Sequence, residues 1–116
     1  MKESYLFWLA IHKNFPKVER MGLGHKIEQS FLDALELTFT LSYLPKENKS
    51  PWITKAIAKM DVVKFFTQLA WEGKLIPTDR YSELLQGLEE IGRQLGGWKK
   101  GLESKTPPIN IRGERQ

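Results

Sequence analysis

The most regular pattern of apolar positions lies in the last third of the chain. After Pro77 and Thr78, which are typical of a helix start, apolar residues recur at alternating steps of three and four positions. These positions are Tyr81, Leu84, Leu88, Ile91, Leu95, Trp98 and Leu102. The alternation places them on one stripe, as in the core-facing seam of a bundle helix. The pattern predicts a helix of about 25 residues, roughly 38 Å long at 1.5 Å per residue.

Three earlier segments also carry a helical period. The first, residues 4–14, is short and rich in aromatic residues, and Pro16 breaks it. The second, residues 23–44, stops at Pro45, and the third starts at Ser50-Pro51, with proline at the first helical position. The predicted core positions are Leu23, Ile27, Ser30, Ala34, Leu37, Leu41 and Leu44 in the second segment and Ile53, Ile57, Met60, Val63, Phe66 and Ala70 in the third. Four amphipathic helices with short loops, and no run that alternates like a strand, predict an all-α, antiparallel four-helix bundle.

The length and composition fit a single small domain. We expect the bundle to occupy residues 1–105 of the 116 and residues 106–116, "TPPINIRGERQ", to form a disordered basic tail. The chain has no cysteine, which excludes disulfides and zinc–thiolate sites and makes a reducing cytoplasm the simplest compartment. The apolar run from Tyr5 to Ile11 is too short to cross a membrane, so no membrane association is expected. The net charge of +4 favours an anionic partner only weakly.

Glycines interrupt the last predicted helix at Gly87, Gly92, Gly96 and Gly97. Relative to alanine, four glycines in a helix interior cost together roughly 3–4 kcal/mol. These glycines lie outside the apolar seam, so the absence of their side chains offsets this cost only where another helix or molecule approaches closely. Gly92 and Gly96 stand one turn apart and form a smooth strip, while Arg93 and Lys100 occupy the outermost face.

There are two interpretations of these glycines. In the first, a neighbouring helix, a second subunit or a phosphate backbone approaches the strip, and Gly96→Ala should then loosen the assembly more than Gly87→Ala. In the second, Gly96-Gly97 simply ends the helix, although the seam continues through Trp98 to Leu102.

Three stretches carry a resemblance to a known family. They are "FPKVERMGLGHKI" (15–27), "AKMDVVKFFTQLAWEGKLIPTDRYSELL" (58–85) and "LEEIGRQLGGWKK" (88–100). Over about residues 4–102 the chain resembles the four-helix-bundle family of accessory variability determinant (Avd) proteins of diversity-generating retroelements, which is related to the 23S rRNA intervening-sequence proteins. The resemblance implies a homo-pentameric barrel with a basic surface that binds the element's reverse transcriptase and RNA and assists cDNA synthesis. The chain departs from the family in its short first segment and its proline-rich tail.

Basic residues are the candidate nucleic-acid contacts. They are Lys17, Arg20 and Lys26 near the first break, Lys55, Lys59 and Lys64 on the third segment, and Arg93, Lys99 and Lys100 on the fourth. Lys55 and Lys59 stand one turn apart with no acidic residue between them, so this helix face repeats positive charge. Phosphate contacts of this kind are sequence-tolerant and strongly salt-dependent. The alternative is an ordinary solvated lysine face.

The four tryptophans favour the core or a subunit interface over base stacking. Trp98 lies on the seam and should be buried, and Trp52 is a candidate partner contact together with Gly92, Gly96 and Gly97. Because Trp8, Trp52, Trp71, Phe65 and Phe66 exceed what one bundle of this size hides, we expect a closed homo-oligomer, a pentamer by resemblance.

A catalytic alternative rests on Arg20 and His25. Their spacing matches the arginine–histidine motif of HEPN ribonucleases, in which histidine acts as acid or base and arginine holds the phosphate. The motif is short and arises often by chance. His12 has no evident partner, and neither a metal site nor a cofactor is expected. The resemblance therefore implies a non-enzymatic subunit that binds reverse transcriptase and RNA, with DNA as a further candidate; the alternatives are a small HEPN-type RNase and an oligomeric scaffold without nucleic acid.

Overall fold

The computed structural model describes residues 1–104. The predicted tail, residues 106–116, lies outside the described residues. Within residues 1–104 every regular element is a helix, which confirms the predicted all-α class.

Five α-helices and one short 3₁₀ helix make up the described chain. They are α1 (Lys2–His12), α2 (Lys17–Met21), α3 (Leu23–Leu41), η1 (Lys46–Asn48), α4 (Lys49–Glu72) and α5 (Thr78–Ser104). The four predicted segments correspond to α1, α3, α4 and α5. The prediction of α5 is confirmed along its whole length, so the interpretation that Gly96-Gly97 ends the helix is wrong.

The helix starts differ from prediction at two places. The five-residue α2 was not predicted, because a helix bounded by Pro16 and Gly22 is too short to show a period. Proline was expected at the first position of α4, but α4 follows η1 directly and begins at Lys49, which leaves Pro51 in the third position. Proline fits there because the first-turn N–H groups need no intrahelical partner.

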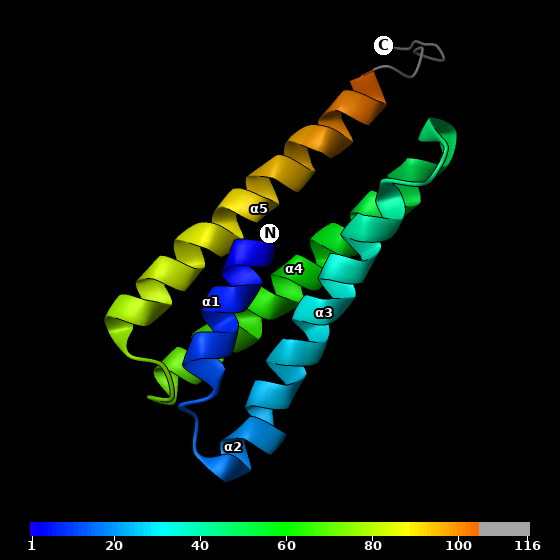
Figure 1. The fold of residues 1–116 in the computed structure, drawn as a ribbon. Helices are drawn as coiled ribbons and strands as arrows, with labels where there is room; N and C mark the ends of the chain where they lie inside the picture. Colours follow the sequence, from blue (N-terminus) through cyan, green and yellow to red (C-terminus); the bar gives the residue numbers. More distant parts are fainter. Residues whose placement is uncertain (105–116) are drawn as a thin grey trace.

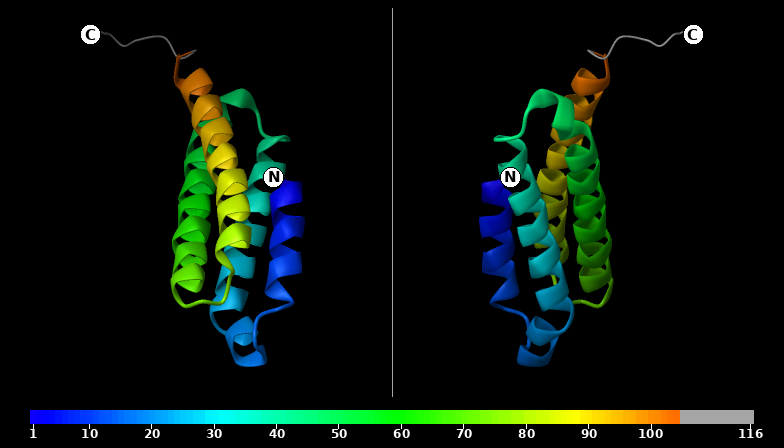
Figure 2. Two further views of the ribbon diagram at one scale, coloured as in Figure 1. Left: turned by 90° about the vertical axis from the view of Figure 1, so that its left-hand side faces the viewer. Right: turned by 90° about the vertical axis from the view of Figure 1, so that its right-hand side faces the viewer.

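The helix α4 forms the spine of the bundle and packs against α3 on one side and α5 on the other (Figures 1 and 2). The short α1 contacts both α3 and α5. Since α1 has 11 residues and α5 has 27, α5 extends well past the N-terminus (Figure 1).

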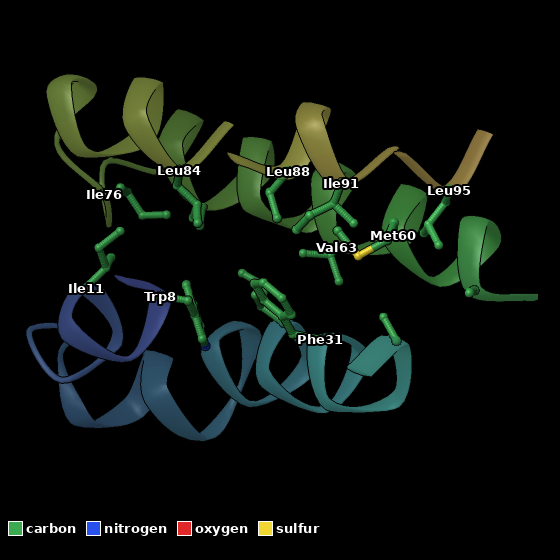
Figure 3. Close-up of a cluster of buried hydrophobic side chains, with 14 of the residues drawn as sticks. Trp8, Ile11, Phe31, Met60, Val63, Ile76, Leu84, Leu88, Ile91 and Leu95 are labelled. Atoms are coloured by element: carbon green, nitrogen blue, oxygen red, sulfur yellow. The ribbon is translucent and has the colours of Figure 1, made fainter. Parts of the chain in front are cut away.

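One core cluster runs along the bundle between these helices (Figure 3). The seam of α5 supplies Leu84, Leu88, Ile91 and Leu95, all buried as predicted. Trp98 was expected to be buried but is only half-buried.

In α4 the seam is rotated slightly from the predicted one. Its buried residues are Ile53, Ala56, Met60, Val63, Thr67 and Ala70. Two predicted members, Ile57 and Phe66, are only half-buried. The small residues Ala56 and Thr67 are buried instead, and hydrophobicity alone did not single them out.

The tryptophan of α1 is a core residue. Trp8 is 0% exposed and belongs to the same cluster as Phe31 and Leu88 (Figure 3). The expectation that Trp8 is one of the aromatic residues that a single bundle cannot bury was therefore wrong. One bundle hides Trp8 because α1 inserts it between α3 and α5.

The turn from α4 to α5 places a lysine in the left-handed region. The N–H of Leu75 donates to the carbonyl of Ala70, and that of Lys74 donates to the carbonyl of Trp71, both at 2.9 Å. These two bonds form a Schellman motif, in which glycine is the usual residue at the left-handed position. Here Lys74 has φ 63°, while Gly73 just before it has φ −80°.

Candidate functional site

The nine predicted nucleic-acid residues lie on four helices rather than on one face. Lys17 and Arg20 belong to α2 and Lys26 to the start of α3. The remaining six divide between α4 and α5. The arrangement is therefore a set of separate basic positions, each of which depends on its own surroundings.

The α3/α4 groove holds three of the predicted site residues. Its volume is about 560 Å³, and its lining residues are Asp33, Glu36, Leu37, Thr40, Trp52, Lys55, Ala58, Lys59 and Val62. Carboxylates stand on the α3 wall and ammonium groups on the α4 wall, with apolar side chains between them. A groove with this distribution suits a polypeptide with an apolar stripe and charges on both flanks.

Both groove lysines have partners, Lys59 across the groove in α3 and Lys55 within its own helix α4. Nζ of Lys59 lies 3.3 Å from Oδ2 of Asp33, and Nζ of Lys55 lies 5.1 Å from the ring centroid of Trp52. No acidic residue lies between Lys55 and Lys59 along α4, as the sequence indicated, but α3 supplies Asp33 from across the groove. The positive potential of this face is consequently weaker than the sequence predicts.

Two other predicted cations have acidic partners on their own helices. Lys64 pairs with Asp61 at 3.7 Å and Arg93 with Glu90 at 2.6 Å. The hydrogen bond and the positive charge of Arg93 lower the pKa of Glu90. Both pairs are solvent-exposed and contribute little to stability.

The glycines of α5 have different surroundings. A Cβ at Gly96 or Gly97 would meet no heavy atom within 4 Å, and one at Gly92 would meet only Nζ of Lys64 at 3.9 Å. At Gly87, by contrast, it would collide with Oγ of Ser4 in α1. Among the glycines of α5, it is therefore Gly87 that a neighbouring helix of the same protomer approaches closely, and the sequence did not predict this. The strip from Gly92 to Gly97 faces outward.

A buried histidine cluster joins α1 to α3. The ring of His12 stacks on Trp8 with centroids 4.9 Å apart, and Phe15 meets its edge at 5.4 Å. Its Nδ1 lies 3.1 Å from Oε1 of Glu28. A Cβ at Gly24 would collide with His12 Nε2. The expectation that His12 lacks a partner was wrong, because its hydrogen-bond partner Glu28 comes from another helix.

Tyr5 packs beside this cluster. Its ring meets Phe31 edge-on at 5.4 Å. Burial raises the pKa of Tyr5, and the nearby carboxylate of Glu28 raises the pKa further.

The arginine–histidine pair of the ribonuclease alternative is not assembled. Arg20 lies in α2, just before the break at Gly22, whereas His25 lies in α3. Both side chains are exposed. Among the described residues, no hydrogen bond or ion pair joins them. Nothing in this arrangement directs the two groups at a common phosphate.

Large apolar side chains are exposed on several helices. Those more than 60% exposed are Leu6, Val18, Met21, Phe39, Tyr43 and Phe65. Phe39 in α3 and Tyr43, just after its end, contact each other edge-on at 5.1 Å on the surface. Contiguous exposed apolar side chains, such as this aromatic pair, are typical of interaction sites.

The fold and surface define a small helical bundle with several candidate macromolecular contact surfaces. The chain belongs to the bAvd-like family, whose model matches residues 4–102. The predicted resemblance to Avd proteins is thereby confirmed. No curated protein and no solved structure matched the chain. Across the described residues, no helix combines the length and apolar character that crossing a membrane demands.

Proposed function

We propose that this protein is a non-enzymatic accessory subunit of a retroelement reverse transcriptase, acting in the cytoplasm. In this proposal the antiparallel four-helix bundle assembles into a closed homo-pentamer. The pentamer binds the reverse transcriptase and the element's RNA, with DNA as a further ligand, and supports cDNA synthesis and retrohoming. Membership of the bAvd-like family supports the accessory role.

The observation that carries the proposal is the set of exposed aromatic side chains on different helices. Phe39 in α3 is 65% exposed and Phe65 in α4 is 62% exposed. A closed ring needs two different surfaces on each subunit, one for each neighbour. Apolar residues on separate helices supply two such surfaces.

The α3/α4 groove supports a protein partner. Its two walls carry opposite charges, so phosphates would be attracted by Lys55 but repelled by Asp33 and Glu36. A partner helix with an apolar stripe and charged flanks would satisfy both walls. We assign this groove, with Trp52 in its lining, to the reverse transcriptase.

Native mass spectrometry tests the assembly. The wild-type protein is expected to form a pentamer at micromolar concentration. Phe39→Asp and Phe65→Asp should each give smaller species with unchanged helical content, because neither side chain belongs to the core. Gln29→Asp, at an exposed polar position of α3, is the matched control and should leave the mass unchanged. A wild-type monomer would contradict the ring.

A labelled RNA distinguishes the functional alternatives. A mobility shift without cleavage supports the proposal, cleavage supports the ribonuclease, and neither result supports a scaffold without nucleic acid. Co-purification with the reverse transcriptase of the same element should be lost on Lys55→Glu with Lys59→Glu, and retained on the matched pair Lys2→Glu with Lys13→Glu in α1 and at its end. If both double variants still co-purify with the reverse transcriptase, the α3/α4 groove is not its binding site.

A further inference from the structure

We propose that single-stranded nucleic acid binds at the end pocket, formed where the last turns of α5 meet η1 and the start of α4. In this site a base stacks on Trp98, and the adjacent phosphates contact Lys46 and Lys49. The inference rests on the nucleic-acid binding proposed above and gives it a location and a ligand class.

The end pocket is lined by residues from three elements. It has a volume of about 330 Å³ and is lined by Lys46, Lys49, Trp98, Gly101 and Leu102. An aromatic ring beside lysines is the combination that single-strand binding proteins use, since every base has a face that stacks and every nucleotide a phosphate. The lining residues include no carboxylate, unlike those of the α3/α4 groove.

The indole of Trp98 is accessible and already carries a cation on its face. Trp98 is half-buried, and Nζ of Lys49 lies 5.4 Å from its ring centroid. A base entering the pocket would take the place of this ammonium, which would move to the phosphate of the same nucleotide. A cation–π contact is thereby exchanged for a stacked base and a charge-assisted hydrogen bond.

Glycine keeps the pocket open along α5. A Cβ at Gly101 would meet no heavy atom within 4 Å, although Gly101 lines the pocket. A Cβ at Gly97, one turn earlier, would also meet no heavy atom within 4 Å, but Gly97 does not line the pocket. A ligand that approaches the α5 backbone at Gly101 would use the open space there and so offset the helix-propensity cost of that glycine.

Flanking charges favour an anion at this end of the bundle. Lys99 follows Trp98 directly, is turned from it by about 100° around the helix and is not one of the lining residues of the pocket. Lys100 is turned by about 200° and lies on the far side of α5. At this end of the bundle, η1 and the last turn of α5 contain two acidic residues, Glu47 and Glu103. The four lysines at positions 46, 49, 99 and 100 outnumber them.

The other three tryptophans are less suited to stacking a base. Trp8 is fully buried, and Trp52 shares its groove with Asp33. Trp71 stacks on Tyr81 with centroids 4.8 Å apart and donates its Nε1–H to Oγ1 of Thr78. Trp98 therefore combines an accessible ring, neighbouring lysines and a lining without carboxylates.

The experiment titrates the full chain with 12-nucleotide oligo(U) and oligo(dT) and with a 12-base-pair RNA duplex, followed by fluorescence anisotropy. Gly101→Leu fills the pocket without changing any charge, and Gly97→Leu is the matched control outside the pocket. We expect Gly101→Leu to weaken oligo(U) binding by about 5- to 100-fold, the worth of one stacked base. Gly97→Leu should change it by less than about twofold, and the duplex should bind more weakly than oligo(U).

A second pair of variants tests the lysines and remains informative if Gly101→Leu fails to fold. Lys46→Gln with Lys49→Gln should reduce the slope of log affinity against log salt by about 1.4, roughly 0.7 per phosphate for a single strand. Lys2→Gln with Lys13→Gln removes the same charge from α1 and the residue after it and should leave the slope nearly unchanged.

Each outcome has a separate meaning. If the wild type binds no oligonucleotide, the nucleic-acid part of the proposed function fails and this inference with it. If the wild type binds but neither Gly101→Leu nor the Lys46/Lys49 variant differs from its control, only the end pocket is refuted. Equal affinity for the duplex overturns the single-strand assignment. A changed native mass in Gly101→Leu with unchanged oligo(U) affinity identifies the pocket as a subunit contact instead.

Discussion

Replacing Gly24 with alanine tests whether the histidine cluster sets the packing of α1 on α3. A Cβ at this position would collide with His12 Nε2, and it would lie 2.7 Å from Cδ2 of the same ring. Carbon atoms in good contact lie about 3.5–4.0 Å apart. The ring, the methyl group or the helix spacing must therefore shift.

The His12 ring cannot move without losing its other contacts. It is stacked on Trp8, meets Phe15 edge-on and lies at hydrogen-bond distance from Glu28. Overpacking of this kind costs about 1–3 kcal/mol, and loss of the hydrogen bond adds about 0.5–1.5 kcal/mol. Alanine recovers at most about 1 kcal/mol of helix propensity. We expect the free energy of unfolding to fall by about 0.5–3.5 kcal/mol.

The assay is denaturant unfolding at one fixed protein concentration, because assembly makes apparent stability depend on concentration. Gly24→Ala is measured in the wild type and again in His12→Ala, which removes the ring. In the second background the change should be close to neutral or stabilising, with the carbonyl of Glu19 at 3.1 Å limiting the gain. The cycle should give a coupling energy of at least about 1 kcal/mol.

The reasoning is refuted by either of two results. Stabilisation of the wild type by Gly24→Ala would mean that the His12 ring moves freely. Equal destabilisation in both backgrounds would mean that the cost arises elsewhere, at the Glu19 carbonyl or in the entry to α3. Gly96→Ala provides the reference for an unhindered helical glycine, because its Cβ would meet nothing within 4 Å.

Three further predictions concern single positions. Lys74→Gly should raise the free energy of unfolding by about 0.5–1 kcal/mol in the same assay, since glycine accepts the φ of 63° without strain; a loss would assign a stabilising contact to the lysine side chain. Gly96→Ala should stabilise the isolated protomer by up to about 1 kcal/mol, and a smaller native mass for this variant would place another subunit against the strip. Arg93→Ala should raise the pKa of Glu90 towards its ordinary value of 4.5 in an NMR titration, and an unchanged pKa would contradict the pair. Because the pKa of Glu90 is lowered in the folded state, the pair stabilises the fold above pH 4.5, and this contribution is lost as the pH falls through the lowered pKa.

The long helices could be predicted from sequence because each presents several turns of a regular apolar period. In α5 the seam from Leu84 to Leu95 is buried as expected, and the helix continues through its glycines. The short α1 has too few turns to establish such a period. Apolar residues surround it on most sides, so their spacing does not single out Trp8 as the residue that points inward.

Contacts between helices could not be predicted, because they depend on how two helices align. Lys59 meets Asp33 and His12 meets Glu28 across gaps of 26 and 16 positions in the chain. Neither spacing is a local signal. Gly24 was the local signal for the contact with His12, since glycine often occurs where a neighbouring group approaches the backbone closely.

The packing of α1 against α5 has a consequence for synthesis of the chain on the ribosome. Trp8 shares its core cluster with Leu88, which is translated 80 residues later. At about 5–20 residues per second, the emerging chain carries an uncovered tryptophan for roughly 4–16 s. Nascent chains on one messenger are close together during this time, and their exposed α1 segments compete with the native contact. Slow codons between residues 72 and 88 should lengthen this interval and increase aggregation without altering the finished protein.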